Sequence, residues 1–364
     1  MCRGYIRNYD HLRCINLSLP MSNNDCIIFI GPLENDGGSG IKNQNIVRHL
    51  SRSIDVYPID TSVWKQNRMM LLVRLFWTFL FHRQNRYIVS TSYKSAYRIF
   101  LMLNILGSLG NVFYWVIGGN LAENIVRDHL SKALYQKLHC IIVEGQSMKN
   151  NLARIGILNV KHCPNFKQID FIPKSSPRED RCVRFLFLSR IHPEKGCNLI
   201  FDAVRRLNSE GLEESFIVDF YGGIFPDYER NFKESLERAN NVAYKGFVDL
   251  MDFQNYKILS SYTAMLFPTY WKTEGFPGII IDAFIAGVPV IASDWNMNSE
   301  LIVDGQNGFL IPPSDSQALY QVMKSIILGK VDICKLKQNC QRQALRYDIN
   351  EVLSEQNLRE IGII

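Results

Sequence analysis

The chain has 364 residues, a length typical of two domains, and its 47% hydrophobic and 21% charged residues exclude a disordered or collagen-like protein. Its net charge of +6 is uneven, because residues 1–165 carry +10 and the remainder carries −4. Residues 61–120 include seven basic residues and no acidic one. Such an excess favours an anionic partner, and nucleic acid, a phosphorylated substrate and an anionic membrane are the candidates.

Cysteine usage and the apolar runs exclude further classes of protein. The nine cysteines are an odd number and contain no C-x-x-C pair, which argues against a disulfide framework or a structural zinc site and favours a reducing, cytosolic setting. The most apolar run, Met69 to Phe81, has 13 residues, whereas a membrane-spanning helix needs about 20. Charged residues interrupt the first 24 residues, which we interpret as an extension rather than a signal peptide.

The first half of the chain alternates between predicted strands and helices. Residues 26–30 form a continuous apolar run, typical of a strand buried on both faces, and a glycine-rich turn at 36–40 leads into a helix. Further strands are predicted at 54–59, 87–90, 111–117 and 140–143. The alternation predicts a parallel sheet with crossover helices over residues 25–165.

A second run of the same kind is predicted over residues 181–344. Its strands are expected at 183–188, 216–221, 242–246, 264–268 and 288–293, and its helices are expected to begin near Gly196, Pro226, Asp249, Pro277 and Asp315. Residues 166–180 contain prolines and a polar cluster, a composition typical of a linker. Two such halves in tandem form a cleft, with ligands at the carboxyl ends of the strands.

The strongest motif is the segment 273–293, T-E-G-F-P-G-I-I-I-D-A-F-I-A-G-V-P-V-I-A-S. Pro277 stands where a helix begins, a position that tolerates its missing N–H. The start of that helix is a ready anion site, suited to a diphosphate, and its free N–H groups are predicted to be those of Gly278, Ile279 and Ile280. Glu274 precedes the helix and Asp282 lies inside it, so one carboxylate can face the phosphate and the other can reach a ribose diol. The alternative for Asp282 is compensation of the helix dipole.

A second motif joins the predicted strand 183–188 to a turn with two cations. Arg190 and Lys195 lie five residues apart in the segment S-R-I-H-P-E-K-G. At the carboxyl end of the strand both side chains can converge on the cleft. The alternative is a solvated loop with a surface lysine, and the presence of the Glu274 motif favours the functional interpretation.

Together the two motifs resemble the donor site of glycosyltransferase family 4, in particular its bacterial capsule and surface-polysaccharide enzymes. The family's members are retaining enzymes with the GT-B fold, two Rossmann-like parallel-sheet domains that face each other across a cleft. The resemblance covers about residues 25–355. It implies that Glu274 holds the donor sugar and stabilises an oxocarbenium-like state, and that Arg190 and Lys195 neutralise the donor diphosphate.

The resemblance also assigns weaker positions. The donor-binding set that it implies consists of Gly38, Phe247, Gly275, Phe276, Gly278, Ile279, Ile280 and Asp282, and the acceptor-side set consists of Gly37, Gly119 and Asn120. The chain departs from the family at Asp282, where Glu is usual, and at 118–120, where many members carry a His that reaches the donor sugar. Glu300 matches a frequent family Glu, and we expect it to be structural.

The resemblance implies a nucleotide-diphosphate sugar as co-substrate, with neither a cofactor nor a metal. The acceptor would be a hydroxyl of a glycan or of a polyprenyl-diphosphate-linked saccharide in surface-polysaccharide biosynthesis. The alternative is a non-catalytic GT-B subunit that binds a partner or a membrane. No zinc, RNP-type or helix-turn-helix signature supports a nucleic-acid partner.

The stretch 64–86 combines an apolar body with five cations, which suits a helix that lies on an anionic membrane. The alternative is a core helix whose cations reach out to solvent. We expect membrane contact, and with it a peripheral location on the inner face of the cytoplasmic membrane. The predicted domains are an extension (1–24), an acceptor-side domain (25–165), a linker (166–180) and a nucleotide-sugar domain (181–344), and residues 345–364 are expected to cross back onto the acceptor-side domain.

Overall fold

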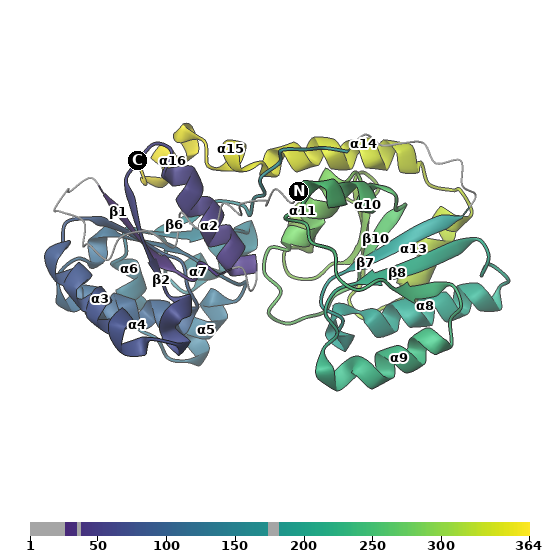
Figure 1. Cartoon of the computed structure of the whole chain (residues 1–364), viewed down its shortest axis with the longest axis horizontal. Coiled ribbons are helices and arrows are strands. Elements are labelled where there is room, and N and C mark those ends of the chain that lie inside the picture. Colours follow the sequence, from purple (N-terminus) through teal and green to yellow (C-terminus); the bar gives the residue numbers. More distant parts are fainter. Residues whose placement is uncertain (1–25, 35–37, 174–181) are drawn as a thin grey trace, which may run out of the picture. The chain divides into compact units, whose positions relative to one another are not determined.

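The computed structural model describes residues 26–34, 38–173 and 182–364, and Figure 1 shows its ribbon. Within these residues the strands form two six-stranded sheets, and the paired strands run parallel. Helices alternate with the strands along the chain. The predicted α/β class is therefore confirmed.

The first sheet has the strand order β2-β1-β3-β4-β5-β6. Its strands are β1 (Ile27–Gly31), β2 (Val56–Asp60), β3 (Arg86–Val89), β4 (Val112–Trp115), β5 (Cys140–Val143) and β6 (Val160–His162). Every residue of β1 is buried, as expected for a central strand covered on both faces. Gly31 ends this strand where only glycine fits, because a Cβ atom there would collide with the Ser90 carbonyl oxygen.

Six helices lie among the described residues of the same half of the chain. They are α2 (Gly38–Leu50), α3 (Arg68–Phe81), α4 (Tyr93–Ile105), α5 (Leu121–Arg127), α6 (Lys132–Gln136) and α7 (Gln146–Arg154). The sequence does not predict β6, because this strand has only three residues and two of them are exposed, so it lacks a buried apolar run.

The second sheet has the strand order β12-β11-β10-β7-β8-β9. Its strands are β7 (Val183–Leu188), β8 (Phe216–Tyr221), β9 (Val242–Tyr244), β10 (Ala264–Phe267), β11 (Val290–Ser293) and β12 (Gly308–Ile311). The strands β7 and β8 have the predicted bounds. The sequence does not predict β12, which begins with a glycine and is only half buried at its centre.

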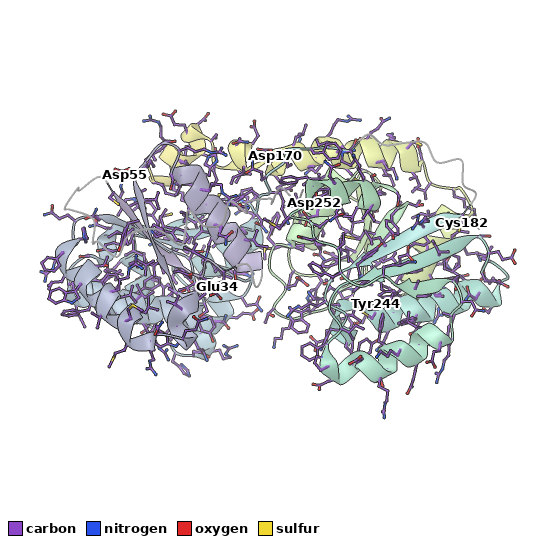
Figure 2. The ribbon with its side chains drawn as sticks, viewed as in Figure 1. Glu34, Asp55, Asp170, Cys182, Tyr244 and Asp252 are labelled. Atoms are coloured by element: carbon purple, nitrogen blue, oxygen red, sulfur yellow. The ribbon has the colours of Figure 1, made fainter. Side chains whose placement is uncertain are left out.

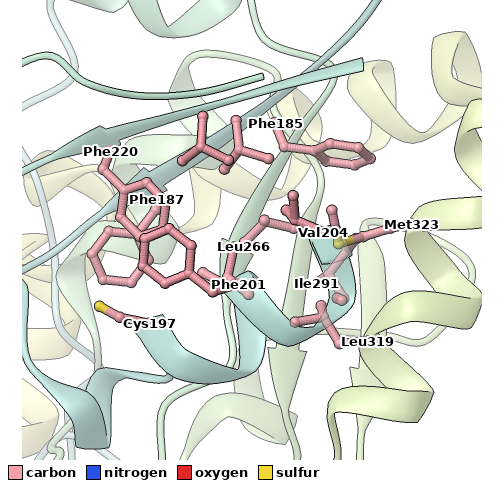
Figure 3. Close-up of a cluster of buried hydrophobic side chains, with 14 of the residues drawn as sticks. Phe185, Phe187, Cys197, Phe201, Val204, Phe220, Leu266, Ile291, Leu319 and Met323 are labelled. Atoms are coloured by element: carbon pink, nitrogen blue, oxygen red, sulfur yellow. The ribbon is translucent and has the colours of Figure 1, made fainter. Parts of the chain in front are cut away.

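The second half of the chain also contains nine helices among the described residues. They are α8 (Cys197–Ser209), α9 (Glu229–Glu237), α10 (Tyr256–Ser260), α11 (Gly278–Ile285), α12 (Asn298–Leu301), α13 (Ser316–Ile327), α14 (Ile333–Ala344), α15 (Ile349–Val352) and α16 (Glu355–Ile361). Apolar side chains of α8 and α13 pack against β7, β8, β10 and β11, as Figure 3 shows for Phe185, Phe187, Phe201, Phe220, Leu266 and Met323. This core fixes β7 beside β10, with Ala264 opposite Phe185.

The chain divides into two compact units that differ from the predicted domains. One unit holds the described residues up to Phe113 together with 137–139, and the other holds 114–136 and 140–364. The predicted domain bounds stay a prediction, and hydrogen bonds tie the segment after β4 to the second half of the chain. The Asn120 amide, for example, donates to the Lys272 carbonyl oxygen at 2.9 Å.

The C-terminal helices α15 and α16 return to the first sheet. Side chains of Val352, Asn357 and Ile361 line one pocket together with residues 161–164, which include the end of β6. The backbone of Lys167 supports this return, since its N–H donates to the Tyr347 carbonyl and its carbonyl accepts from the Ile349 N–H, each at 2.9 Å.

Candidate functional site

Glu274 and Lys195 meet at the carboxyl edge of the second sheet. Lys195 follows β7 through a short 3₁₀ turn (Pro193–Lys195), and Glu274 lies in the loop between β10 and α11. Because β7 and β10 are neighbouring parallel strands, their following loops emerge at the same edge. There the Lys195 ammonium hydrogen-bonds the Glu274 carboxylate, and the Thr269 hydroxyl lies 3.2 Å from the same oxygen.

This ion pair is largely removed from water. The side chain of Lys195 is 5% exposed and that of Glu274 is 14% exposed. Gly196 makes the tight turn after Lys195 possible, because its φ of 84° is left-handed and a Cβ atom would collide with the Pro268 carbonyl. A charged pair held in a partly buried site interacts more strongly with an incoming ion than an exposed pair would.

The two predicted cations, Arg190 and Lys195, both lie within cation–π distance of the Trp271 indole ring. The Arg190 guanidinium carbon lies 5.2 Å from the ring centre, and the Lys195 ammonium lies 5.5 Å from it. The His192 ring packs edge-on against the same indole at 4.8 Å. The structure therefore brings Arg190, Lys195 and Glu274 together as predicted. Trp271 was not among the predicted site residues, because a single aromatic residue in a loop carries no spacing signal.

The start of α11 agrees with the prediction only in part. Pro277 is the residue before the helix, and Gly278 is its first residue, so the helix begins one position later than the proline. The prediction of a free N–H at Ile280 is wrong, because this group donates to the Pro277 carbonyl at 3.0 Å in the first turn. Gly278 and Ile279 remain the candidates for an anion at this helix start.

Asp282 lies in a buried cluster that the sequence did not predict. Its Oδ2 atom accepts a hydrogen bond from the Lys167 ammonium at 2.7 Å, and its Oδ1 atom accepts one from the Tyr256 hydroxyl at 2.6 Å. Burial, and then the adjacent carboxylate, raise the pKa of the Tyr256 hydroxyl, which therefore stays a donor. Each carboxylate oxygen accepts one hydrogen bond from within the protein and the side chain is 3% exposed, so ribose binding by Asp282 stays a prediction.

Gly119 and Asn120 lie against the loop that carries Glu274. A Cβ atom on Gly119 would lie 2.7 Å from the Glu274 carbonyl oxygen, so only glycine permits this approach. Asn120 donates to the Lys272 carbonyl at 2.9 Å, and Asn296 donates to the Glu274 carbonyl at 3.1 Å. A pocket of about 160 Å³ adjoins these residues and Glu274. The Asn120 side chain thus bonds the backbone of the loop that carries Glu274. The predicted contact of Asn120 with an acceptor stays a prediction.

Glu300 has the structural role that we expected. One carboxylate oxygen accepts from the Gln146 N–H at 2.7 Å, and the other accepts from the N–H and hydroxyl of Ser147 at 3.0 and 2.6 Å. These donors belong to the first turn of α7, whose free N–H groups attract a negative charge. Glu300 therefore caps a helix 154 residues away in the sequence.

The remaining predicted donor-binding residues differ in accessibility. The side chain of Phe247 is 79% exposed. Three residues before it lies Tyr244, labelled in Figure 2, whose hydroxyl donates a hydrogen bond to the Gly222 carbonyl at 3.0 Å. Phe276 is instead buried and packs against the Tyr347 ring at 5.9 Å, so only its backbone is available to a ligand. Gly275 is half buried, Gly38 begins α2, and Gly37 lies outside the described residues.

Comparisons with known proteins show the family to which this chain belongs. Residues 168–360, more than half of the chain, match the family model of glycosyl transferases group 1. The amylovoran biosynthesis glycosyltransferase AmsK of Erwinia amylovora is 25% identical over 231 residues, which cover 61% of this chain and 53% of AmsK. The UDP-Gal:alpha-D-GlcNAc-diphosphoundecaprenol alpha-1,3-galactosyltransferase of Escherichia coli is 23% identical over 198 residues, 54% of this chain and 49% of the enzyme. The chain thus spans about half the length of the curated relatives that it matches.

Solved structures share the fold. The crystal structure of HepE from Anabaena in complex with UDP matches with a TM-score of 0.72 and 17% identity, and the match covers 93% of this chain and 100% of HepE. At this identity the likeness shows the fold alone. The predicted GT-B fold is confirmed by these structural neighbours and by the two parallel sheets.

Proposed function

The chain belongs to the glycosyl transferases group 1, and on that premise we propose that it transfers a sugar from a nucleotide-diphosphate sugar to a hydroxyl of a glycan or lipid-linked saccharide. The observation that carries this proposal is the buried Lys195–Glu274 pair beside Arg190, at the carboxyl edge of a parallel sheet. Two cations and one carboxylate are what a leaving diphosphate and a developing oxocarbenium ion require. The biosynthetic relatives support a place in surface-polysaccharide assembly.

We propose UDP as the nucleotide of the donor. HepE, which shares the fold, was crystallised with UDP, and the Escherichia coli relative is named for UDP-galactose. Lys195 can serve the diphosphate without leaving Glu274, because an ammonium group has three N–H donors. Arg190 is exposed and can place its planar guanidinium on the phosphate oxygens.

The proposed reaction retains the configuration of the sugar and needs no metal. The bond between the anomeric carbon and the phosphate oxygen breaks as the acceptor hydroxyl bonds to that carbon on the same face. The proton of the hydroxyl passes to the leaving diphosphate oxygen. Glu274 stabilises the positive charge that develops on the sugar, and Arg190 and Lys195 stabilise the negative charge on the leaving group.

The acceptor that we propose is a saccharide linked to a lipid diphosphate. The Escherichia coli relative is named for such an acceptor, an N-acetylglucosaminyl diphosphoundecaprenol. The basic residues of 61–120 would suit the diphosphate and the membrane that holds it. We therefore propose a peripheral location on the inner face of the cytoplasmic membrane.

Donor hydrolysis tests the proposal. UDP-, GDP- and ADP-sugars are incubated with the purified chain, and the variants E274Q and K195A are compared with E213A and K330A, which alter exposed residues of the same types away from the site. We expect slow hydrolysis of one donor that falls roughly a hundredfold or more in E274Q and K195A and is unchanged in the two controls. Absence of binding and turnover for every donor, even with membrane lipid extract, would contradict an enzymatic function.

One observation favours a second candidate, a non-catalytic GT-B subunit. Asp282 stands where the resembling family usually has Glu, and Lys167 and Tyr256 occupy its carboxylate. The same donor panel separates the two functions, because a subunit without activity would show the same null turnover in the wild type and in E274Q.

A further inference from the structure

The outward face of α3 is apolar although it faces solvent. The helix packs inward through Leu71, Leu75, Thr78 and Phe79, a spacing of three and four residues that defines one face. Six other side chains are between 42% and 75% exposed, namely Met69, Met70, Val73, Phe76, Trp77 and Phe81. A surface helix of a globular protein normally turns polar residues to this side, so a contiguous apolar face marks an interaction surface.

Arg74, the charged residue in the middle of α3, does not make the exposed face polar. Arg74 turns inward, where it donates to the Tyr57 hydroxyl at 2.9 Å and to the Pro58 carbonyl at 3.3 Å. The exposed cations stand instead at the two ends, with Arg68 as the first residue of α3 and Arg83 just beyond its last residue. The face is therefore an apolar strip with a cation at each end.

The neighbouring helix α4 extends the same character. Leu101 and Ile105 lie four residues apart and are 44% and 84% exposed, and the exposed Arg98 precedes them by about one turn. Both helices belong to the same compact unit of the described chain, and Figure 1 labels each of them in the first half of the chain. Both helices thus expose apolar side chains together with at least one cation.

We propose that this face of α3 and α4 docks the protein on an anionic lipid bilayer. The charge decides between a membrane and a second copy of the chain. Residues 61–120 contain seven basic residues and no acidic one, so two copies of the face would repel, whereas anionic headgroups attract it. The exposed aromatic side chains Phe76, Trp77 and Phe81 suit the boundary between headgroups and acyl chains. In naming the membrane, the inference rests on the proposed function, which places a lipid-linked acceptor there.

The helix would lie in the plane of the membrane surface. With 14 residues α3 is about 21 Å long, shorter than the hydrocarbon core of a bilayer. Among residues 26–34, 38–173 and 182–364, no helix is long and apolar enough to cross a membrane. The three rings form one continuous group, since Trp77 packs edge-on against Phe76 at 5.8 Å and stacks on Phe81 at 5.3 Å, so they can enter the interface together.

Vesicle sedimentation of the full chain tests this surface. The probes are vesicles of phosphatidylcholine alone and vesicles with a third of phosphatidylglycerol, and the test variant is F76S/W77S/F81S. The matched control is L158S/V303S/L328S, which removes three exposed apolar side chains from other parts of the chain. All six changes affect exposed positions, and circular dichroism checks that each variant folds. Donor hydrolysis in solution is measured alongside, so that failure of the proposed function is seen separately.

We expect binding to the anionic vesicles that falls at least roughly tenfold in the α3 variant and stays unchanged in the control. R68Q/R83Q should weaken binding roughly twenty-fivefold, about fivefold for each charge, and high salt should have a similar effect. Equal binding of the wild type and the α3 variant would overturn the inference. So would a wild-type dimer that the α3 variant converts to a monomer, since this would assign the face to a second copy. Hydrolysis in solution should be unchanged by the α3 substitutions.

Discussion

Replacing Lys167 with methionine separates a structural role of Asp282 from a role in ribose binding. The Lys167 ammonium lies 2.7 Å from Asp282 Oδ2, and the Tyr256 hydroxyl lies 2.6 Å from Oδ1. The Asp282 side chain is 3% exposed, whereas that of Lys167 is 31% exposed. The variant K167M keeps most of the aliphatic stem but leaves a buried carboxylate with one neutral donor.

The size of the effect follows from this burial. Removing one partner of a buried ion pair costs about 3–5 kcal/mol, and the partial exposure of Lys167 favours the lower end, about 3 kcal/mol. A loss of this size lowers Tm by roughly 6–12 °C in a cooperative unit of 150–250 residues. The variant D282N removes the charge but keeps an acceptor for Tyr256, so it should cost about 1 kcal/mol. The double variant should be about as stable as D282N, because no charge is left unpaired.

Thermal and urea denaturation of the four proteins measure these differences, and calorimetry measures their affinity for UDP and for 2′-deoxy-UDP. If the pair is structural, the folded variants bind UDP within about twofold of the wild type. If Asp282 binds the ribose, D282N and the double variant should both lose the preference for UDP over its deoxy analogue, and K167M should keep it. A stability of K167M within about 0.5 kcal/mol of the wild type would refute the reasoning, since such a value is typical of surface substitutions.

Three further predictions concern the site and its frame. W271L should weaken UDP binding roughly five- to thirtyfold, because two cation–π contacts of about 0.5–1 kcal/mol each are lost, and W271F should recover most of it in the same titration. E300A should destabilise the fold by about 2 kcal/mol in urea denaturation through loss of the cap on α7, and E300Q should recover part of this. If transfer needs no metal, donor hydrolysis should be the same with excess EDTA as without it, and a loss restored by Mg²⁺ would contradict the metal-free mechanism.

The sequence by itself determined the features that depend on short stretches of the chain. Largely apolar runs locate β7 and β8 residue for residue, although each contains one charged residue, Arg184 in β7 and Asp219 in β8, and these two pair with each other at 3.1 Å. Local pattern also places Lys195 and Glu274 each in a loop that follows a predicted strand. Their strands turned out to be neighbours, and parallel neighbours end at the same edge.

Tertiary structure alone decided the partners that lie far apart in the chain. Nothing local indicates that Lys167 pairs with Asp282, 115 residues away, or that Glu300 caps a helix start 154 residues away. Tertiary packing also decides which face of α3 is buried. The sequence contains apolar residues all around this helix, and only the packing of the helix on the rest of the protein determines which of them stay in solvent. Periodicity encodes what a segment can form, whereas its neighbours are set by the simultaneous packing of the whole core.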